Sequence, residues 1–306
     1  MDTTVDRRAT AEAALDQDPH DRLLRLAGRA PDGWLAVARE ELGAGDFERV
    51  TELFAALEPV LGAQTPRRYR FAPDGDVPRD EADEADEAVV AAVAGDPETV
   101  ACWAAMRDGA DRVYLVQADY DADLAGITLD VQRGVDEDAI PRVEVFAPDT
   151  ELPRYHERAL RSAVLLWTRD PLGEVKVART FDGASAESGP WFAPARELVA
   201  DPGERRRLLD FFDAGEVLVE TGARMTDLLS GAAGAVPADL RTDGRWVWSD
   251  ATRYYLERHM LAPDIELARY AMATPSARTP LSPLDRYRAL TALNPENEEG
   301  PLWPAG

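Results

Sequence analysis

The 306-residue chain contains one cysteine, Cys102, and one lysine, Lys176. A single thiol excludes a disulfide scaffold and a thiolate zinc finger, because both need several cysteines. No apolar run approaches the ~18 residues that a membrane-spanning helix needs. The N-terminal stretch MDTTVDRRATAEAALDQDPH lacks the apolar region and the cleavage site of a signal peptide. The sequence therefore predicts a cytoplasmic protein without a membrane span.

Positive charge is also scarce. The chain has 34 Lys and Arg residues against 58 Asp and Glu residues, which gives a net charge of -24. Phosphate contacts need clustered basic side chains, so this balance argues against nucleic-acid binding. An acidic surface attracts a cationic partner protein, and the alternative is a solvated acidic surface without a dedicated partner. The content of 45% hydrophobic and 30% charged residues is that of a globular protein.

The common catalytic motifs are missing as well. The chain contains no H-E-x-x-H pair, no G-x-S-x-G nucleophile turn and no glycine-rich phosphate loop. Its three histidines, His20, His156 and His259, are too far apart in the sequence to form a paired zinc motif. These absences favour a non-catalytic protein.

One acidic stretch has the spacing of calcium ligands. Asp119, Asp121 and Asp123 alternate along the chain, and Asp130 follows at the position of the last ligand of an EF-hand. The glycine that such a loop needs at its sixth position is replaced by Leu124. Aspartate at a strand-to-helix junction is typical of a helix cap. We therefore predict no bound metal and no cofactor.

Composition and turn signals divide the chain into five segments. Prolines and an acidic run separate an N-terminal group of amphipathic helices from the rest, and a second proline-rich stretch ends the chain. The predicted segments are a helical N-terminal segment (1–66), a Pro-rich acidic linker (67–87), an α/β domain (88–180), an α+β C-terminal module (181–274) and a Pro-rich tail (275–306), in which 284–293 has the pattern of a helix.

The predicted fold class is a mixture of α+β and α/β. Strands alternate with helices in the central segment, which is typical of a layered α/β unit with partly parallel pairing. Their order is also that of a thioredoxin-like core, although the chain has no C-x-x-C motif. The predicted central strands are 112–118, 142–146, 162–167 and 174–178.

Helix starts and turns complete the expected secondary structure. Asp96-Pro97 has the form of a helix start and predicts a helix through Met106. In the C-terminal module, apolar spacing predicts a helix over 194–214. An Asp-Gly turn precedes an aromatic strand at 245–248, and a capped helix is expected over 250–259.

The densest group of aromatic side chains lies between residues 242 and 267. Its two tryptophans share one face of a strand, and its two tyrosines follow in the next helix. Because Trp and Tyr dominate the energetics of protein interfaces, this group predicts a partner-binding surface. The alternative is a strand that packs on its helix, with the tryptophans in the core. The candidate binding residues are Asp243, Trp246, Trp248, Asp250, Tyr254 and Tyr255.

The same stretch carries a resemblance to known sequences. Its motifs are T-D-G-x-W-x-W-x-D, Y-Y-L-x-x-H and L-A-P-D-x-E-L. They resemble a C-terminal module of an uncharacterised actinobacterial protein family, and similar segments look like those of toxin–immunity-associated proteins. The stretches ALDQDPHDRLLRLAGRAPDGWLAVARE, RVYLVQAD and PRVEVFAPDTELPRYHERAL resemble other parts of the same family, so the likeness covers most of the chain. The resemblance implies no catalytic residue.

These observations predict a non-catalytic protein-binding protein of immunity or regulatory type, whose partner is a cationic protein. Two alternatives stay open. One is an enzyme with a carboxylate-based site outside the known motifs, since any two of the 58 acidic residues can meet in space. The other is a structural subunit of a larger assembly. The oligomeric state stays open too.

Overall fold

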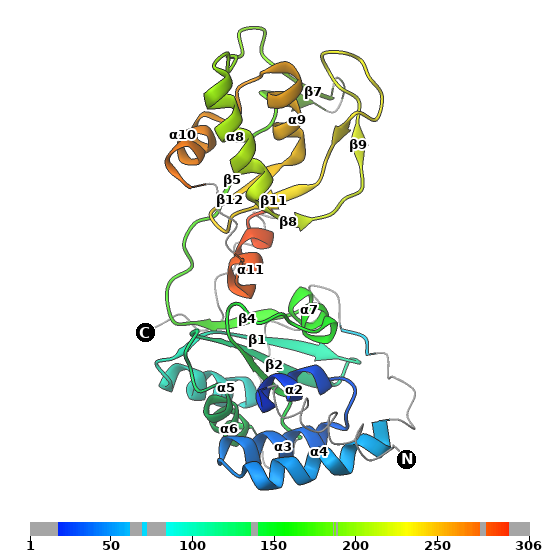
Figure 1. Ribbon diagram of the computed structural model, residues 1–306, viewed down its shortest axis with the longest axis vertical. Helices are drawn as coiled ribbons and strands as arrows, with labels where there is room; N and C mark the ends of the chain where they lie inside the picture. The colour runs from blue at the N-terminus through cyan, green and yellow to red at the C-terminus, as the bar shows by residue number, and fades with distance from the viewer. Residues whose placement is uncertain are drawn as a thin grey trace, which may run out of the picture. The chain divides into compact units, whose positions relative to one another are not determined.

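The chain forms two compact units in the computed structural model, which describes residues 18–61, 69–71, 84–135, 140–185, 187, 189–275 and 280–293 (Figure 1). Unit 1 is Met1–Pro171 together with Glu299–Gly306, and unit 2 is Leu172–Glu298. Each unit combines helices with a mixed sheet, which confirms the predicted mixed α+β fold. None of the described helices is long and apolar enough to cross a membrane.

The two units divide the chain differently from the five predicted segments. Their boundary lies at Pro171, before the predicted boundary at 180. The N-terminal helices belong to the same unit as the central sheet, and Ala125 of a later helix packs against their core. Most of the predicted linker at 67–87 lies outside the described residues, and its last part begins helix α5 (Glu84–Gly95).

Three helices open the described part of unit 1. They are α2 (Pro19–Leu26), α3 (Asp32–Gly43) and α4 (Phe47–Leu61). Asp18 begins α2 because its side chain accepts a hydrogen bond from the His20 N–H, and a proline takes the first helical position. The apolar faces of these helices share one buried core, and the three helices lie within the predicted helical segment 1–66.

The sheet of unit 1 has the strand order β3-β2-β1-β4. Strand β1 (Thr99–Arg107) is antiparallel to both β2 (Asp111–Ala118) and β4 (Val164–Thr168). Strand β3 (Val143–Phe146) is parallel to β2 and is reached through helix α6 (Leu124–Gly134). Helix α7 (Arg154–Arg161) joins β3 to β4. Helices α5 and α6 pack on the face that carries Cys102, Tyr114 and Val145.

Strand β1 corrects the helix that we predicted from Asp96-Pro97. The Asp96 side chain accepts a hydrogen bond from the Glu98 N–H, and the Asp96 backbone carbonyl accepts one from the Thr99 N–H. These two bonds close a turn at Asp96-Pro97. The next residues form the central hairpin of the sheet, where both faces of β1 are buried. A strand buried on both faces lacks polar alternation, so its sequence pattern is indistinguishable from that of a buried helix.

The structure also differs from the strand order that suggested a thioredoxin-like core. The last strand of that order, 174–178, is reduced to β5 (Lys176–Val177) and belongs to unit 2, where it pairs with β12 (Trp246–Ser249). The fourth strand of the unit 1 sheet is instead β1. The predicted strands at 112–118, 142–146 and 162–167 are confirmed as β2, β3 and β4.

Unit 2 is built on a second sheet with the order β5-β12-β11-β8. Helix α8 (Pro202–Ala214) begins later than the predicted 194, because the Asp201 side chain caps it by accepting a hydrogen bond from the Glu204 N–H. The other elements are the ribbon β6 (Gly183–Ser185) and β7 (Gly189–Trp191), β8 (Glu216–Val219), the ribbon β9 (Arg224–Met225) and β10 (Val236–Pro237), β11 (Leu240–Thr242), α9 (Asp250–His259), α10 (Ile265–Ala273) and α11 (Pro283–Thr291).

The core of unit 2 is aromatic. The ring centroids of Phe211 and Trp248 are 5.2 Å apart, and Phe212 packs on the same tryptophan at 5.9 Å. A Cβ on Gly215 would come within 2.2 Å of the Trp248 ring, so the end of α8 needs glycine there. At the sheet edge, the Lys176 ammonium lies 5.5 Å from the Trp246 ring centroid and donates a hydrogen bond to Glu266 at 2.8 Å.

Candidate functional site

Three of the six predicted binding residues lie in the core of unit 2. Trp246, Trp248 and Tyr255 are 7%, 1% and 2% exposed. The tryptophans pack on α8 and α10, and Tyr255 packs on Phe192 with ring centroids 4.7 Å apart. The alternative that the sequence left open, a strand packed on its helix, therefore describes these three residues. They offer no exposed anchor to a partner.

The other three predicted residues hold the local structure around α9. Asp243 accepts hydrogen bonds from the backbone N–H groups of Arg245 and Trp246, and so fixes the turn between β11 and β12. Asp250 accepts a 2.7 Å hydrogen bond from Nε of Arg241. Tyr254 is half-buried, and its hydroxyl donates to Asp227 at 3.1 Å. Only Tyr254 leads to a larger polar cluster.

That cluster centres on Asp227, a buried carboxylate in the loop between β9 and β10. Its Oδ2 accepts hydrogen bonds from the Ser230 hydroxyl at 2.5 Å, from Nε2 of His259 at 2.7 Å and from Tyr254. Its Oδ1 accepts from the backbone N–H of Leu229 at 2.9 Å. The carboxylate thus ties the 226–235 loop to the C-terminal end of α9. Asp227 is not among the six predicted binding residues, and its partner His259 lies 32 residues further along the chain.

The Asp227 cluster has the residue types of a hydrolase triad in a different arrangement. A nucleophilic serine needs a histidine between itself and the carboxylate, so that the imidazole can take the hydroxyl proton. Here Ser230 and His259 both bond to the same carboxylate oxygen. Burial alone would raise the pKa of Asp227, but the hydrogen bonds from Ser230, Leu229 and His259 outweigh it and hold the pKa well below its usual range. The cluster is therefore a fixed anchor for the loop.

The anchored loop presents apolar side chains to solvent. Leu228 and Leu229 are 40% and 52% exposed, although the Leu228 N–H is fixed by the Tyr255 hydroxyl at 3.1 Å. Met260 follows α9 and Leu198 lies beside it, since the Val199 N–H donates to the Met260 carbonyl at 2.8 Å. Both of these side chains are exposed too. We call this set, Leu198, Leu228, Leu229 and Met260, the α9-end surface.

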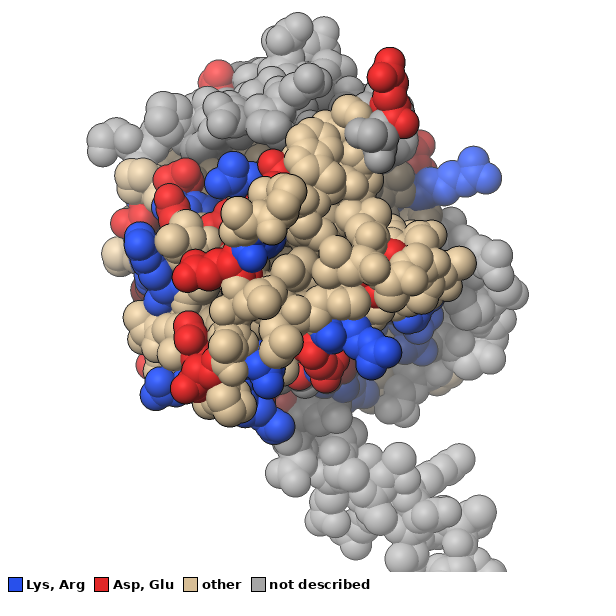
Figure 2. Space-filling model, turned by 90° about the horizontal axis from the view of Figure 1, so that it is seen from above, with Lys and Arg blue, Asp and Glu red and all other residues tan. Residues whose placement is uncertain are grey.

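Met260 has an unusual backbone conformation. Its φ of 58° and ψ of 15° place it in the left-handed region, where it caps α9 by donating its N–H to the carbonyls of Tyr255 and Leu256. Glycine is the usual residue at such a cap, since a side chain there costs about 1–2 kcal/mol. On the face that Figure 2 shows, residues other than Asp, Glu, Lys and Arg form a continuous area, with charged side chains around it and a few within it.

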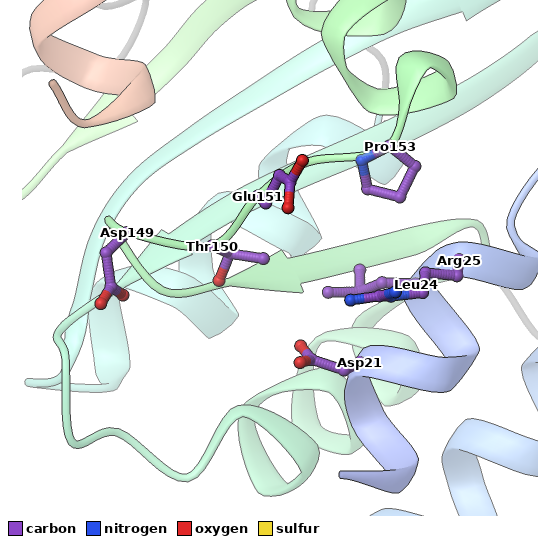
Figure 3. A pocket seen from close by; sticks show the side chains of 7 residues that line it. All are labelled: Asp21, Leu24, Arg25, Asp149, Thr150, Glu151 and Pro153. Carbon is purple, nitrogen blue, oxygen red and sulfur yellow. The ribbon is translucent and has the colours of Figure 1, made fainter. Parts of the chain in front are cut away.

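Unit 1 has a separate polar cleft of about 290 Å³. Figure 3 shows that helix α2 forms one wall and that the segment before α7 forms the other. The lining carries three carboxylates and one guanidinium, and two of the carboxylates, Asp149 and Glu151, are exposed to solvent. The described residues contain no group of three or more His, Cys, Asp or Glu side chains that could hold a metal. The lining residues are Asp21, Leu24, Arg25, Asp149, Thr150, Glu151 and Pro153.

The acidic stretch with calcium-ligand spacing and the single cysteine both belong to the structure of unit 1. Asp123 caps α6, where its side chain accepts a 3.0 Å hydrogen bond from the Gly126 N–H, and Asp119 pairs with Arg169 at 2.7 Å. The cap interpretation of this acidic stretch is thus confirmed. Cys102 is fully buried in β1, and burial raises the pKa of its thiol, which disfavours the reactive thiolate.

Comparison with protein-family models, with curated proteins and with solved structures gave no significant match. The resemblance to an actinobacterial family with immunity-associated relatives therefore stays a prediction.

Proposed function

We propose that the chain is a non-catalytic protein-binding protein of immunity or regulatory type, which contacts its partner through the α9-end surface. The observation that carries this proposal is the Asp227 anchor. A buried carboxylate with side-chain and backbone donors holds a loop whose next two residues, Leu228 and Leu229, are exposed leucines. A loop that served only as a connection would not need to display two apolar side chains.

The rigidity of the loop favours binding. Association costs about 0.5–1.5 kcal/mol for each side chain that must be ordered, and a surface that is already ordered avoids much of this cost. Three separate segments contribute to the α9-end surface, and backbone hydrogen bonds of Glu197 and Val199, the neighbours of Leu198, join two of them. Apolar groups gathered from several segments on one surface are typical of an interaction site.

The strained cap gives independent support. Glycine at position 260 would relieve the left-handed backbone, so the methionine side chain is costly for stability. Methionine is flexible and polarizable, and it is common on surfaces that adapt to a protein partner. A role in binding explains why an exposed side chain occupies this position.

The partner that fits is a protein with an apolar contact patch and an excess of Lys and Arg. The net charge of -24 steers such a protein toward the chain over distances larger than the contact itself. The apolar patch supplies the close contact, and the charge accelerates the encounter. Association is therefore expected to slow as salt concentration rises.

The test is quantitative capture of the partner from native extract at low and high salt. We expect wild-type protein to retain one basic protein in stoichiometric amount, with less recovered at high salt. L229S and M260G are each expected to reduce the amount of recovered partner at least about tenfold. V217S is the matched control, because Val217 is an exposed aliphatic residue of the same unit on β8. Equal capture by L229S and wild type, or no capture by wild type, would refute the proposal.

A further inference from the structure

Unit 2 contains a second surface feature, a cleft of about 350 Å³ beside α9. Ribbon β9–β10 and strand β11 contribute to its lining, together with α9 and the end of α8. Its charged lining consists of three arginines and two aspartates, in a chain where acidic residues outnumber basic ones. These residues are Arg224, Arg241, Arg253, Asp213 and Asp250.

Two of the three arginines have carboxylate partners. Arg253 donates to both carboxylate oxygens of Asp213, at 2.5 and 3.2 Å, and to Glu257 at 2.7 Å. Arg241 donates to Asp250 at 2.7 Å and to the Gly215 carbonyl at 3.0 Å. Their positive charges are compensated within the cleft.

Arg224 differs from both. Its Nε donates to the Gly234 carbonyl at 2.8 Å, and its Nη2 donates to the Ala235 carbonyl at 3.1 Å. Neutral carbonyls orient a guanidinium without cancelling its charge. Within the described part of the chain, no carboxylate forms an ion pair with Arg224. The cleft therefore holds one positive charge that is fixed in direction and has no counter-charge in contact.

We propose that this cleft binds an oxyanion, a carboxylate or a phosphate group, against the outer edge of the Arg224 guanidinium. A guanidinium has five donors in a rigid fork that matches these groups, and Arg224 uses two of them in its bonds to the loop. Arg241 lines the same cleft and has donors beyond the two in its described bonds, but Asp250 compensates its charge, so Arg224 carries the site. The two aspartates of the cleft are each paired with another arginine, Asp250 with Arg241 and Asp213 with Arg253, and charges beyond about 8 Å are screened at physiological salt.

This inference does not depend on the α9-end surface. Arg224 lies on β9, whereas the apolar residues come from the segment before α8, from the loop after β9 and from the end of α9. A partner with an acidic side chain and a free metabolite anion would use the same guanidinium. Acetate and inorganic phosphate represent the two chemistries.

The experiment is an NMR titration of the full chain with sodium phosphate and, separately, with sodium acetate. Sodium chloride keeps the ionic strength constant, and the backbone amides of Arg224 and Ala235 are followed. We expect saturable shifts with a dissociation constant in the millimolar range for at least one anion. R224Q should weaken binding at least about tenfold, because it removes the charge and the fork together. The spectrum of each variant reports directly whether it is folded.

R206Q is the matched control, because Arg206 is an exposed arginine of the same unit that pairs with Asp210 on α8. It should bind like wild type. R224K should bind with intermediate affinity, since lysine keeps the charge and loses the fork. Shifts that stay linear up to about 50 mM of both anions, or saturable binding retained in R224Q, would overturn the proposal.

Discussion

The two units hold their interiors together by different means. In unit 1, Glu144 is buried on the edge strand β3, where it contacts Arg39 of α3 at 2.6 Å and Nε2 of His156 of α7 at 2.8 Å. In unit 2, Phe211, Phe212 and Trp248 fill the equivalent space between the sheet and its helices. In unit 1, charge contacts to α3 and α7 are thus added to an apolar core, whereas in unit 2 aromatic rings pack the helices on the sheet.

A second charged cluster extends this difference. Arg107 of β1 is bonded to Asp32 of α3 and to Asp111 of β2, and Arg142 contacts the same two carboxylates. The Tyr155 hydroxyl accepts from Arg107 at 3.3 Å. A buried ion pair gives little net stability against an apolar core of similar volume, but losing one partner is costly. Unit 1 should therefore respond to single charge changes in its interior more than unit 2 does.

The largest expected effect is the loss of a ring from unit 2. W248A should lower the free energy of unfolding of unit 2 by about 4 kcal/mol, because it leaves a large cavity among packed rings. Urea unfolding followed through the amide signals of each unit measures it. I265A, at a 58% exposed position, should change it by less than about 0.5 kcal/mol. A small loss for W248A would contradict a core held by ring packing.

Removing the buried charge should affect unit 1 nearly as much. E144Q keeps the shape of the side chain but leaves Arg39 buried without a counter-charge, so we expect a loss of about 3 kcal/mol in unit 1. Burial alone would raise the pKa of Glu144, but the charges of Arg39 and His156 outweigh it and lower the pKa, so the ionised form is the one that folding stabilises. The same urea experiment measures the loss.

The control for E144Q is D130N, since Asp130 forms a 3.8 Å pair on the exposed surface of α6. It should change stability by less than about 0.5 kcal/mol. An equal effect of the two substitutions would mean that the Glu144 contacts do not hold unit 1 together.

A pH change should produce a smaller difference between the unfolding free energies of the two units. Burial lowers the pKa of His20, whose Nε2 lies 2.7 Å from the Val145 carbonyl. Below the unfolded value of about 6.5, the unfolded chain binds more protons at this position than the folded one, so stability falls as pH falls. One such histidine contributes at most about 1.4 kcal/mol per pH unit. Urea midpoints of unit 1 between pH 7 and pH 5 should show a slope that H20Q reduces; an unchanged slope would contradict this assignment.

The smallest expected effect is a gain. M260G should stabilise unit 2 by about 0.5–1 kcal/mol, because glycine relieves the left-handed backbone. D108G is the comparison in unit 1. Asp108 also has a positive φ, of 52°, but aspartate tolerates this region and its side chain accepts a 2.8 Å hydrogen bond from the Arg70 N–H. D108G should therefore give no gain. Thermal unfolding measures the stability of both variants. A loss of stability in M260G would show that the methionine side chain does not strain the backbone at position 260.

The elements with clear local signals were predictable from the sequence. Asp18-Pro19 marks α2, Ser249 begins α9, and the Asp-Gly turn before an aromatic stretch marks β12. Strand β1 was predicted as a helix, since burial on both faces removes the period-two pattern. Local propensity and periodicity cannot show which faces of an element other parts of the chain will cover.

The candidate site was predictable only in part. The motif at 242–267 led to Tyr254, which belongs to the Asp227 cluster, but it also led to Trp246 and Trp248, which are core. Asp227 gives one weak local signal, an aspartate three residues before a serine in an apolar loop. Its role depends on His259, and a contact over that distance in the chain is set by the fold.

The single lysine has a practical consequence for chemical labelling. Lys176 bridges β5 to α10 through Glu266 and lies over Trp246, and its side chain is still 45% exposed. Amine-directed reagents therefore meet one side chain in this protein, at a defined place in unit 2. A dye attached there reports on unit 2 alone, and acetylation there removes one charge and one sheet-edge contact in a single step.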